Sequence, residues 1–453
     1  MPQKRISAVI NRALLYADIL ASVMPKKIII TKEFKEAYKA MNDTDDNIFL
    51  TGRAGTGKST LLKYFRKKTK KKHVVLAPTG VAALNVKGQT VHSFFGFHPA
   101  IKPSLVHKAA KEALPLFNAI ETIIIDEISM IRADLLDCID TALRLNRGRP
   151  KDPFGGVQMI FIGDLYQLPP VVTRDEAFRF ETEYTSPYFF SAYSMIEVPI
   201  KIIELQKVHR QKEKTFVSLL DKLRRNTLDQ TDVETWNERH DPYFDPRDEP
   251  GFIHLTTTNK MAKERNDYEL KQLSGKEWKL KASSMGDLPD RRMPSEASIS
   301  VKEGARIMFT TNDPARRWVN GSLGTITRIK KIGLSKLPVL EVELESGKEV
   351  EVKQHKWELF EYEHDGDGDL EESTVGSYTQ YPITLAWAVT IHKGQGKTFD
   401  NVLVDVGWGA FAHGQLYVAL SRCTKFKGLV LLKPFRLKDV IVDQAVVDFM
   451  DRA

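Results

Sequence analysis

Five short apolar runs between residues 47 and 206 constrain the fold of this chain more than any other feature. They are "NIFLTG", "HVVLAPTG", "TIIIDE", "VQMIFIGD" and "KIIELQ", and helical patterns separate them. Strands that are apolar on both faces are typical of parallel sheets covered by helices on each side. The pattern therefore predicts a doubly wound α/β lobe.

A second series of runs predicts a second α/β lobe. It consists of "GFIHLTTTN", "ARIMFTT", "NVLVDV" and "LVLLKP", with helical stretches such as "KMAKERNDYELKQL" between its members. Within this lobe "VLEVELESGKEVEV" alternates apolar and acidic residues around a Ser-Gly turn, so we expect a small β-barrel insertion there. We interpret the following "EYEHDGDGDLEES" as a solvated acidic loop, because it lacks the glycine and the closing glutamate of a calcium loop.

The stretch "GRAGTGKST" follows the first apolar run and opens a helical pattern. In that context glycines let backbone N–H groups surround a phosphate at a helix N-terminus, Lys58 reaches the β- and γ-phosphates, and Ser59 holds Mg²⁺. The sequence therefore predicts that ATP and Mg²⁺ bind here. The predicted loop residues are Gly52, Ala54, Gly55, Thr56, Gly57, Lys58, Ser59 and Thr60.

Polar side chains end the third and fourth apolar runs. Asp126 suits a shell of Mg²⁺, and Glu127 suits general-base activation of a water. An acidic helix cap would explain only one of these carboxylates. Gln167, in "GDLYQLPP", is placed to hydrogen-bond a γ-phosphate and the attacking water, because strand ends of such a sheet meet at one edge. The alternative is that Gln167 only caps the "LPP" turn.

The chain carries 67 basic and 59 acidic residues, a net charge of +8. This excess suits a polyanionic partner, although many soluble enzymes carry as much. Hydroxyls, amides and cations near predicted strand ends suit phosphate contacts, and the phenylalanines at 94, 95 and 97 offer either a stacking face or core packing. The predicted nucleic-acid contacts are Pro78, Thr79, Gly80, Thr90, His92, Ser93, Phe95, Thr256, Asn259, His392 and Lys393.

Localisation follows from weaker signals. The two cysteines, Cys138 and Cys423, are far apart, which fits a reducing compartment. No apolar run approaches 18 residues, so we expect no membrane-spanning helix. Residues 1–30 are basic and amphipathic and are expected to form a surface helix, with an organelle transit peptide as the alternative. We expect a cytoplasmic, nucleoid-associated protein if the source is prokaryotic.

Taken in order, these motifs resemble those of superfamily-one helicases. They are "GRAGTGKST", "APTGVAALN", "TVHSFFGF", "IIIDEISM", "GDLYQLPPV", "VHRQ", "AVTIHKGQGKT" and "GQLYVALSRC". The segment "RADLLDCIDTALRLNRGRPKDPFGGVQ" resembles the signature stretch of the Pif (petite integration frequency) DNA helicases. The resemblance covers roughly residues 31 to 435.

The resemblance implies a domain plan. It consists of two RecA-like lobes, a wedge insertion in the first and a Src-homology-three-like β-barrel insertion in the second. Lobe one would comprise 31–93 and 119–196, with the wedge at 94–118. Lobe two would comprise 197–323 and 379–453, with the barrel at 324–378.

The resemblance also implies residue roles. Arg210 and Arg422 would be arginine fingers from lobe two, and Gly396 would approach the γ-phosphate. The chain would translocate 5′ to 3′ on single-stranded DNA, act on 5′-tailed duplex or G-quadruplex DNA, and be monomeric without DNA. One departure is that "IIITKEFKEAYKA" lacks the glutamine that reads adenine in this family.

Two rival hypotheses remain at this point. One is a RecD-like or phage-type helicase of the same superfamily, which the "PFGGVQ" signature disfavours. The other is a nucleotide-switched clamp that binds nucleic acid without unwinding it. The complete set of Glu127, Gln167, Arg210 and Arg422 disfavours the clamp.

Overall fold

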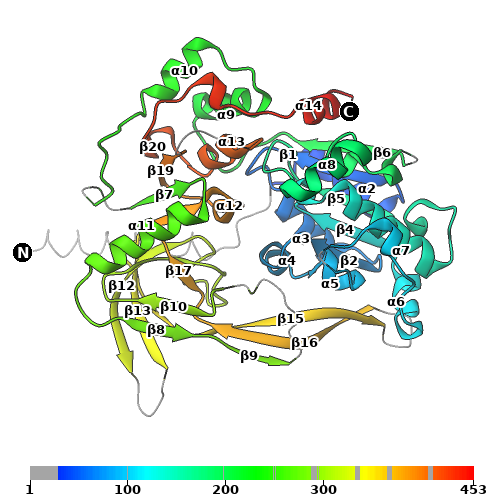
Figure 1. Ribbon diagram of the computed structural model, residues 1–453, viewed down its shortest axis with the longest axis horizontal. Coiled ribbons are helices and arrows are strands. Elements are labelled where there is room, and N and C mark those ends of the chain that lie inside the picture. Colours follow the sequence, from blue (N-terminus) through cyan, green and yellow to red (C-terminus); the bar gives the residue numbers. More distant parts are fainter. Residues whose placement is uncertain are drawn as a thin grey trace, which may run out of the picture.

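The computed structural model describes residues 29–452 except 99, 197, 248, 250, 287–292, 294, 332–336, 365–369 and 407–411. The predicted N-terminal helical segment, 1–30, lies outside the described residues apart from its last two. Two parallel-sheet lobes and one antiparallel β-domain surround the middle of the molecule (Figure 1). No helix within the described part is long and apolar enough to cross a membrane.

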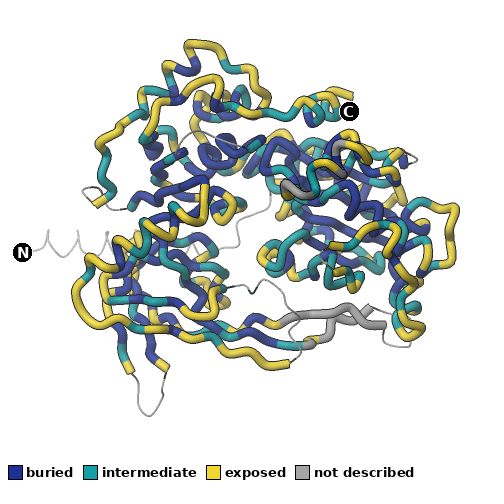
Figure 2. Tube along the Cα trace, viewed as in Figure 1, coloured by how far each residue is buried: buried dark blue, intermediate teal, exposed yellow. Residues whose placement is uncertain are grey.

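Lobe one is built on a six-stranded parallel sheet, as the apolar runs predict. Its strands lie in the order β3 (Gln89–Thr90), β2 (His73–Ala77), β4 (Thr122–Asp126), β5 (Gln158–Ile162), β1 (Asn47–Gly52) and β6 (Ile200–Leu205). Side chains alternate between two cores along each strand. On β1, Phe49 packs toward one side, and Ile48 and Leu50 pack toward the other. Burial of both faces explains why the runs are continuously apolar (Figure 2).

Helices cover both faces of this sheet. α2 (Lys32–Asp43) and α3 (Lys58–Lys68) pack on the face that buries Ile48, while α7 (Ala133–Arg147) packs on the opposite face. Short helices α4 (Gly80–Val86) and α5 (Val91–Phe95) follow β2 and β3, and α8 (Arg174–Glu183) follows β5.

The signature segment, residues 132–158, contains α7 and the turn after it, and it packs against the base of the wedge. The carboxylate of Asp140 on α7 accepts a hydrogen bond from Phe154 N at 2.6 Å, and Arg147 donates to Gly155 O at 2.8 Å and to Ile120 O at 2.8 Å. Gly155 is required here, because a Cβ would lie 2.7 Å from Leu143 O. The wedge itself contains α6 (Leu114–Ala119) and two 3₁₀ turns. The signature therefore stabilises the base of the wedge.

Lobe two contains a four-stranded parallel sheet. Its order is β18 (Ala388–Thr390), β7 (Phe252–Thr256), β19 (Asn401–Asp405) and β20 (Leu429–Leu431). Its helices are α9 (Lys214–Arg225), α10 (Gln230–Asn237), α11 (Asn259–Gln272), α12 (Ile391–Gly394) and α13 (Gln415–Leu420). α14 (Gln444–Asp451), which the predicted range 379–453 assigned to lobe two, packs on lobe one instead, because Phe449 stacks on Phe190 with ring centroids 4.3 Å apart.

The β-domain is larger than the predicted barrel at 324–378. A five-stranded antiparallel sheet runs β14 (Glu349–Val352), β13 (Pro338–Leu344), β12 (Leu323–Lys331), β11 (Arg306–Phe309) and β17 (Ile383–Leu385). A ribbon of β8 (Trp278–Lys281) and β10 (Ser298–Val301) shares its core and makes it barrel-like. The prediction that "ARIMFTT" belongs to the lobe-two sheet is wrong, because β11 pairs antiparallel with β12 and β17.

A long arm extends from the β-domain toward the wedge. It consists of β15 (His355–His364), β16 (Leu370–Gln380) and β9 (Ser283–Gly286), and β15 lies against α6 (Figure 1). The predicted acidic loop is therefore wrong for 361–364 and 370–373, whose backbone is paired in this arm. Paired strands satisfy the backbone hydrogen bonds that a charge pattern alone does not reveal.

The predicted boundary at residue 197 is also corrected. β6 pairs with β1 from Asn47↔Ile200 to Gly52↔Leu205, so residues 200–205 belong to the lobe-one sheet. The polypeptide enters lobe two only after this edge strand.

Candidate nucleotide site and nucleic-acid track

The loop from Gly52 to Lys58 joins β1 to α3 at the carboxyl edge of the lobe-one sheet. Gly55 and Gly57 have positive φ angles of 82° and 98°, a conformation that favours glycine. Gly57 is the N-cap of α3 and gives no side-chain cap, and an added Cβ there would meet nothing within 4 Å. No side chain therefore caps the first N–H groups of α3, which leaves them available to a phosphate.

Lys58 lies in this cradle, and within the described residues its ammonium bonds to no carboxylate. Its ammonium donates to Gly52 O at 2.5 Å and to Arg53 O at 3.2 Å, both neutral carbonyls. Burial lowers the pKa of Lys58, and the charges of Asp164 and Glu127 counter part of that shift. A buried cation on neutral partners fits a site for phosphate, which would supply the missing negative charge.

The two predicted carboxylates end β4. Glu127 adopts a left-handed conformation with φ of 53°, which turns the chain sharply at the strand end. Burial, with the adjacent charge of Glu127, raises the pKa of Asp126 to about 7. Burial also raises the pKa of Glu127, against the opposing effect of Lys58. Two buried acids with raised pKa values suit proton transfer or a cation.

Gln167 is held by its side chain as well as by its backbone. Its Nε2 donates to Asp164 Oδ2 at 3.1 Å, and its Oε1 accepts from Gln395 Nε2 of lobe two at 3.4 Å. The same Gln395 Nε2 donates to Glu127 Oε2 at 3.3 Å. The "LPP" turn is therefore not what the Gln167 side chain binds, and the amide connects the turn of Asp164 to the other lobe.

Asp164 and Arg224 form a buried ion pair that sequence reasoning missed. The Arg224 guanidinium donates to Asp164 Oδ1 at 3.0 Å and to Glu204 Oε1 at 3.1 Å, and it lies over the Tyr166 ring. Although burial acts to raise it, this guanidinium holds the pKa of Asp164 below its usual range. The pair fixes the carboxylate that in turn positions Gln167.

The two predicted arginine fingers reach the same region. Arg210 donates to Ser421 O at 3.2 Å, and Arg422 donates to Val418 O at 2.8 Å and to Ser421 Oγ at 2.7 Å. Within the described residues neither guanidinium forms a direct ion pair. Burial, together with the charge of Arg210, lowers the pKa of Arg422 to about 9.

The origin of Arg210 requires a correction. It follows β6, so it comes from the segment that joins the lobes and not from lobe two proper. Its Cβ lies 2.5 Å from where a Cβ on Gly55 would stand. Gly55 therefore permits the close approach of Arg210 to the phosphate loop.

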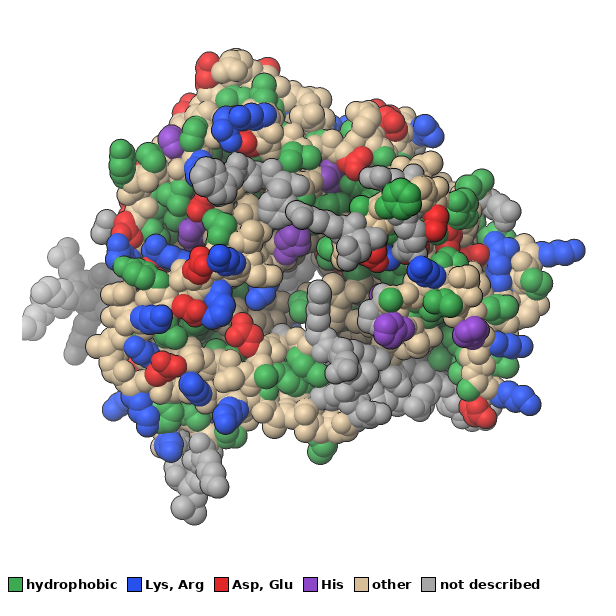
Figure 3. Space-filling model, viewed as in Figure 1, with side chains coloured by type: hydrophobic (Ala, Val, Ile, Leu, Met, Phe, Trp, Pro, Cys, Tyr) green, Lys and Arg blue, Asp and Glu red, His purple; other side chains and the backbone are tan. Residues whose placement is uncertain are grey.

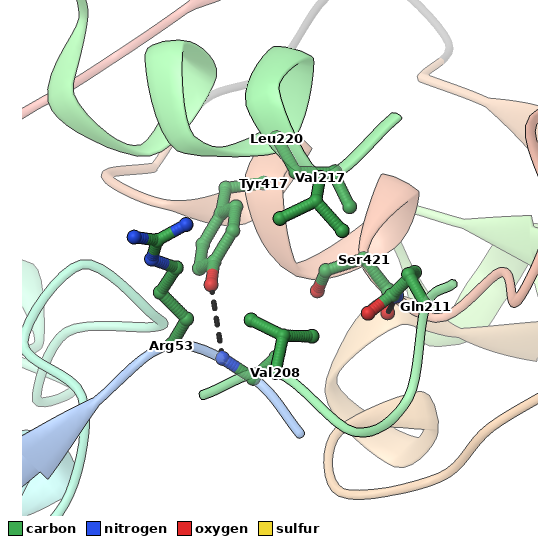
Figure 4. Close-up of a pocket in the computed structure, with 8 residues that line it drawn as sticks. Arg53, Val208, Gln211, Val217, Leu220, Tyr417 and Ser421 are labelled. Atoms are coloured by element: carbon green, nitrogen blue, oxygen red, sulfur yellow. Dashed lines mark hydrogen bonds between the residues drawn. The ribbon is translucent and has the colours of Figure 1, made fainter. Parts of the chain in front are cut away.

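A small cavity lies where the phosphate loop meets α13 (Figure 4). Ala54 N donates to Tyr417 Oη at 3.1 Å, and Val208, Gln211 and Leu220 line the remaining wall. Lobe two thus contacts the loop directly. Gly396, the other predicted phosphate neighbour, has φ of 76° and no atom within 4 Å of an added Cβ.

The residues present fit a Mg²⁺ ion only in company with phosphate. Within the described residues, no cluster of three or more histidine, cysteine, aspartate or glutamate side chains is suited to hold a metal. Ser59 is exposed at the start of α3, and Asp126 is the nearest predicted carboxylate ligand in the same site. Mg²⁺ commonly takes one or two protein ligands, with phosphates and waters completing its shell.

Predicted strand-contact residues lie at the carboxyl ends of both sheets. Pro78, Thr79, Gly80, Thr90, His92, Ser93 and Phe95 follow or end β2 and β3, and Thr256, Asn259, His392 and Lys393 follow or end β7 and β18. Thr79 and Thr90 accept hydrogen bonds from Ala82 N and Ser93 N, each at 3.2 Å. Each hydroxyl keeps its own proton available for a phosphate oxygen.

Thr256 does not fit its predicted role. It is 1% exposed, and its hydroxyl donates to Thr258 O at 3.2 Å. Thr258 is exposed instead and caps α11 by accepting from Met261 N at 3.2 Å. The geometry thus favours Thr258 over Thr256 at this strand end.

The three phenylalanines of "SFFGF" pack as a cluster. Phe95 stacks on Phe97 with ring centroids 5.1 Å apart, and Phe94 meets Phe117 at 5.8 Å. All three are half-buried against the core beside α7. The core-packing interpretation therefore accounts for part of the surface of these rings.

Elsewhere on the surface, Lys and Arg side chains gather over the β-domain and α11, at the lower left of Figure 3.

Comparisons with known proteins identify the family. The family model described as PIF1-like helicase matches residues 29–234. A Bdellovibrio bacteriovorus protein named ATP-dependent DNA helicase Pif1 is 31% identical over 451 residues, which cover 96% of this chain and 95% of that protein. The chain belongs to the PIF1-like helicase family.

Other relatives are longer than this chain. The ATP-dependent DNA helicase PIF1 of Danio rerio is 33% identical over 439 residues, which cover 95% of this chain and 65% of that protein. The Homo sapiens protein of the same name is 33% identical over 399 residues and is covered to 58%. The chain thus spans about two thirds or less of these two relatives.

Solved structures of this family share the fold. A Bacteroides sp Pif1 in complex with ADP-AlF4 matches with a TM-score of 0.85 and 33% identity, covering 94% of this chain and 97% of that one. A Bacteroides Pif1 bound to ssDNA matches with a TM-score of 0.67 and 34% identity at the same coverage. The two RecA-like lobes with their added antiparallel domain are thereby confirmed.

A signal for Arg224 was present in the sequence. Phe216, Leu219, Leu220 and Leu223 form the apolar stripe of α9, and Arg224 falls on that stripe eight residues after Phe216. A charge on an apolar stripe needs a buried partner. For Gln395 the sequence held no comparable signal, since its partners lie in the other lobe.

Proposed function

We propose that this chain is an ATP-dependent DNA helicase that couples ATP hydrolysis to movement along a single strand. The observation that carries the proposal is the convergence of Lys58, Glu127, Gln167, Arg210 and Arg422 between the two lobes. The three cations of this group, Lys58, Arg210 and Arg422, lack direct ion-pair partners within the described residues. Membership of the PIF1-like helicase family supports the same activity.

The residues divide the work of phosphoryl transfer. When bound, ATP supplies the phosphoanhydride and Mg²⁺ neutralises part of its charge, with Ser59 and Asp126 as the protein ligands. Glu127 accepts the proton of the attacking water, and Gln167 orients that water. Lys58 stabilises the charge on the β- and γ-phosphates.

The cations from beyond lobe one complete the site. Arg210 and Arg422 stabilise the charge that develops during transfer, and Gly396 permits close approach of the backbone to the γ-phosphate. Because Arg422 comes from lobe two, the arrangement of the lobes controls turnover. Because the stretch "IIITKEFKEAYKA" lacks a glutamine, the adenine base is less strictly recognised, so GTP is expected to support turnover at a rate closer to that of ATP than it does in relatives that carry the glutamine.

The strand-contact residues bind phosphates without reading sequence. Thr79, Thr90, Thr258, His392 and Lys393 lie at strand ends of both lobes, so one strand can be held by two bodies that move relative to each other. Affinity for single strands is expected to fall with salt, with a slope near −0.7 per neutralised phosphate. A flat salt response would contradict phosphate tracking.

The finer proposals rest on the family resemblance. We propose 5′-to-3′ movement, unwinding of 5′-tailed duplex and G-quadruplex DNA, and a role in replication, repair, recombination or telomere maintenance. We further propose a monomer in the absence of DNA and, for a prokaryotic source, a nucleoid-associated protein.

Strand displacement tests the proposal. Duplexes with a 5′ or a 3′ single-stranded tail and a folded G-rich substrate are incubated with the protein, with and without ATP. We expect ATP-dependent displacement of the 5′-tailed duplex and none by the Lys58→Ala variant. Nucleotide-dependent binding without displacement would support the clamp instead, and displacement of the 3′-tailed duplex alone would reverse the polarity.

A further inference from the structure

Gln395 lies where the strand-contact helix of lobe two meets the nucleotide site of lobe one. It directly follows the four-residue helix α12, and its backbone N donates to His392 O at 3.2 Å. Its side-chain Nε2 lies 3.3 Å from Glu127 Oε2 and 3.4 Å from Gln167 Oε1. One amide group, with two N–H donors, thus contacts both the base and the water-orienting residue.

The other end of this connection faces solvent. His392 and Lys393 are exposed on α12, and both are predicted strand contacts. Thr390 caps the helix by accepting from Lys393 N at 3.3 Å, and buried Gly394 packs against Leu255. Since α12 has a single turn, a shift of Lys393 displaces Gln395, only two residues further along the chain.

The two hydrogen bonds of the Gln395 amide are long. Distances of 3.3 Å and 3.4 Å exceed the usual 2.7–3.2 Å of N–H···O bonds, so each bond is weak and readily exchanged. The donor also occupies a carboxylate lone pair of Glu127 that would otherwise accept the proton of water. In this arrangement the Gln395 amide therefore restrains Glu127.

We propose that Gln395 is a positioning residue that restrains Glu127 and Gln167 until a strand engages α12. The inference rests on the proposed function and deepens it. Strand contact at His392 and Lys393 shifts α12, the amide leaves Glu127, and the base becomes free to accept a proton. Coupling between strand and nucleotide then passes through one identifiable side chain.

Gln395→Ala and Gln395→Met test this role. Neither side chain can donate a hydrogen bond to Glu127 and neither adds a charge, and methionine is close to glutamine in length, so a defect seen in the alanine variant alone is assigned to lost packing. We expect strand-free turnover to rise about twofold to tenfold, as loss of one hydrogen bond would allow. The stimulation of kcat by saturating single-stranded DNA should fall by a similar factor, while the half-saturating DNA concentration stays within about twofold.

A binding measurement gives a readout that needs no turnover. The Kd for a fluorescent single strand is measured with and without a non-hydrolysable ATP analogue, and the ratio of the two values reports the coupling between the sites. We expect a ratio different from 1 in the parent and a ratio closer to 1 in both variants. The exposed Gln444→Ala variant on α14 is the matched control and should keep the parent ratio.

The outcomes are decisive in both directions. A parent ratio of 1, or variants that keep the parent ratio and the parent stimulation, would overturn the role of Gln395. In combination with Gln167→Ala, the loss from Gln395→Ala should be less than additive, and full additivity would also contradict the inference. A parent that fails to displace any strand with ATP would instead overturn the proposed function.

Discussion

The helices at the carboxyl ends of the two parallel sheets begin in two different ways. Four helices that follow a strand closely start with a threonine whose hydroxyl accepts a backbone N–H: α4, α5, α11 and α12. α3 starts instead with Gly57 in the left-handed conformation and no side-chain cap. A threonine cap satisfies the helix internally, whereas the glycine leaves N–H groups available to a ligand.

The two kinds of helix start correspond to two proposed functions, which are nucleotide binding and strand binding. The uncapped helix and the charges of Lys58, Asp126 and Glu127 belong to lobe one, and the threonine-capped helices of both lobes carry the predicted strand contacts. Lobe two adds Arg422 and Gln395 to the first of these functions. The nucleotide site is therefore complete only when both lobes are in place.

Lys58→Ala should break the comparison most strongly. Without the ammonium, the loop before α3 loses the positive charge that would bind phosphate, so we expect ATP turnover to fall to background. Removal of a charge-stabilising cation costs at least roughly 10³-fold in turnover. Single-strand binding by the nucleotide-free protein should stay within a few-fold of the parent, because the lysine is absent from the strand contacts. Turnover above background would refute the site.

Arg422→Ala tests the contribution of lobe two. We expect kcat to fall about 10³-fold while binding of an ATP analogue stays within a few-fold, because the guanidinium acts on developing charge. Arg436→Ala, at an exposed arginine paired with Asp439, is the control and should retain parent kcat. If analogue binding is lost and kcat is not, Arg422 holds the ground state and not the transition state.

Asp126→Asn tests the buried charge on the lobe-one edge. A carboxyl whose folded pKa, about 7, lies above its unfolded value destabilises the fold when ionised. This penalty is absent below about pH 4, grows through the window up to about pH 7, and is constant above it. In metal-free buffer the variant should therefore gain about 1–3 kcal/mol of stability at pH 7.5 and nothing at pH 4. Denaturant unfolding at both pH values measures it, and an equal gain at both would contradict the assigned cause.

Thr258→Ala addresses the capped class of helices. Removing the hydroxyl leaves Met261 N without its cap, and we expect a loss of about 0.5–2 kcal/mol in the free energy of unfolding. Thr235→Ala, within α10, removes a hydroxyl that donates to Thr231 O of the same helix and caps no helix end, so it should cost less. Equal costs for the two variants would mean that the cap is not what stabilises α11.

Local patterns predicted the parts of the site that lie next to one another in the chain. The glycines and Lys58 share one loop, and Glu127 ends a continuous apolar run, so their roles could be inferred from spacing. The contacts of Gln395 and the Asp164–Arg224 pair join segments 60 or more residues apart, and only packing of the lobes brings them together. No local pattern encodes that distance.

The same limit explains the errors in the fold. β6 has the apolar composition of either sheet, and its place is decided by pairing with β1. β11 was predicted as a parallel strand because its run is short and apolar on both faces, yet it lies in the buried middle of an antiparallel sheet. Burial fixes composition, and composition alone does not distinguish the two kinds of sheet.

The most direct test of the account is the ATPase activity of Gln167→Ala with and without single-stranded DNA. If Gln167 joins the chemistry to lobe two through Asp164 and Gln395, the variant should bind ATP with near-parent affinity and lose most of its stimulation by DNA. Its free energy of unfolding should fall by no more than the loss of an ordinary hydrogen bond allows, about 0.5–1.5 kcal/mol. A variant that hydrolyses ATP with full stimulation by DNA would remove Gln167 from the mechanism and contradict the claim that the two lobes form one site.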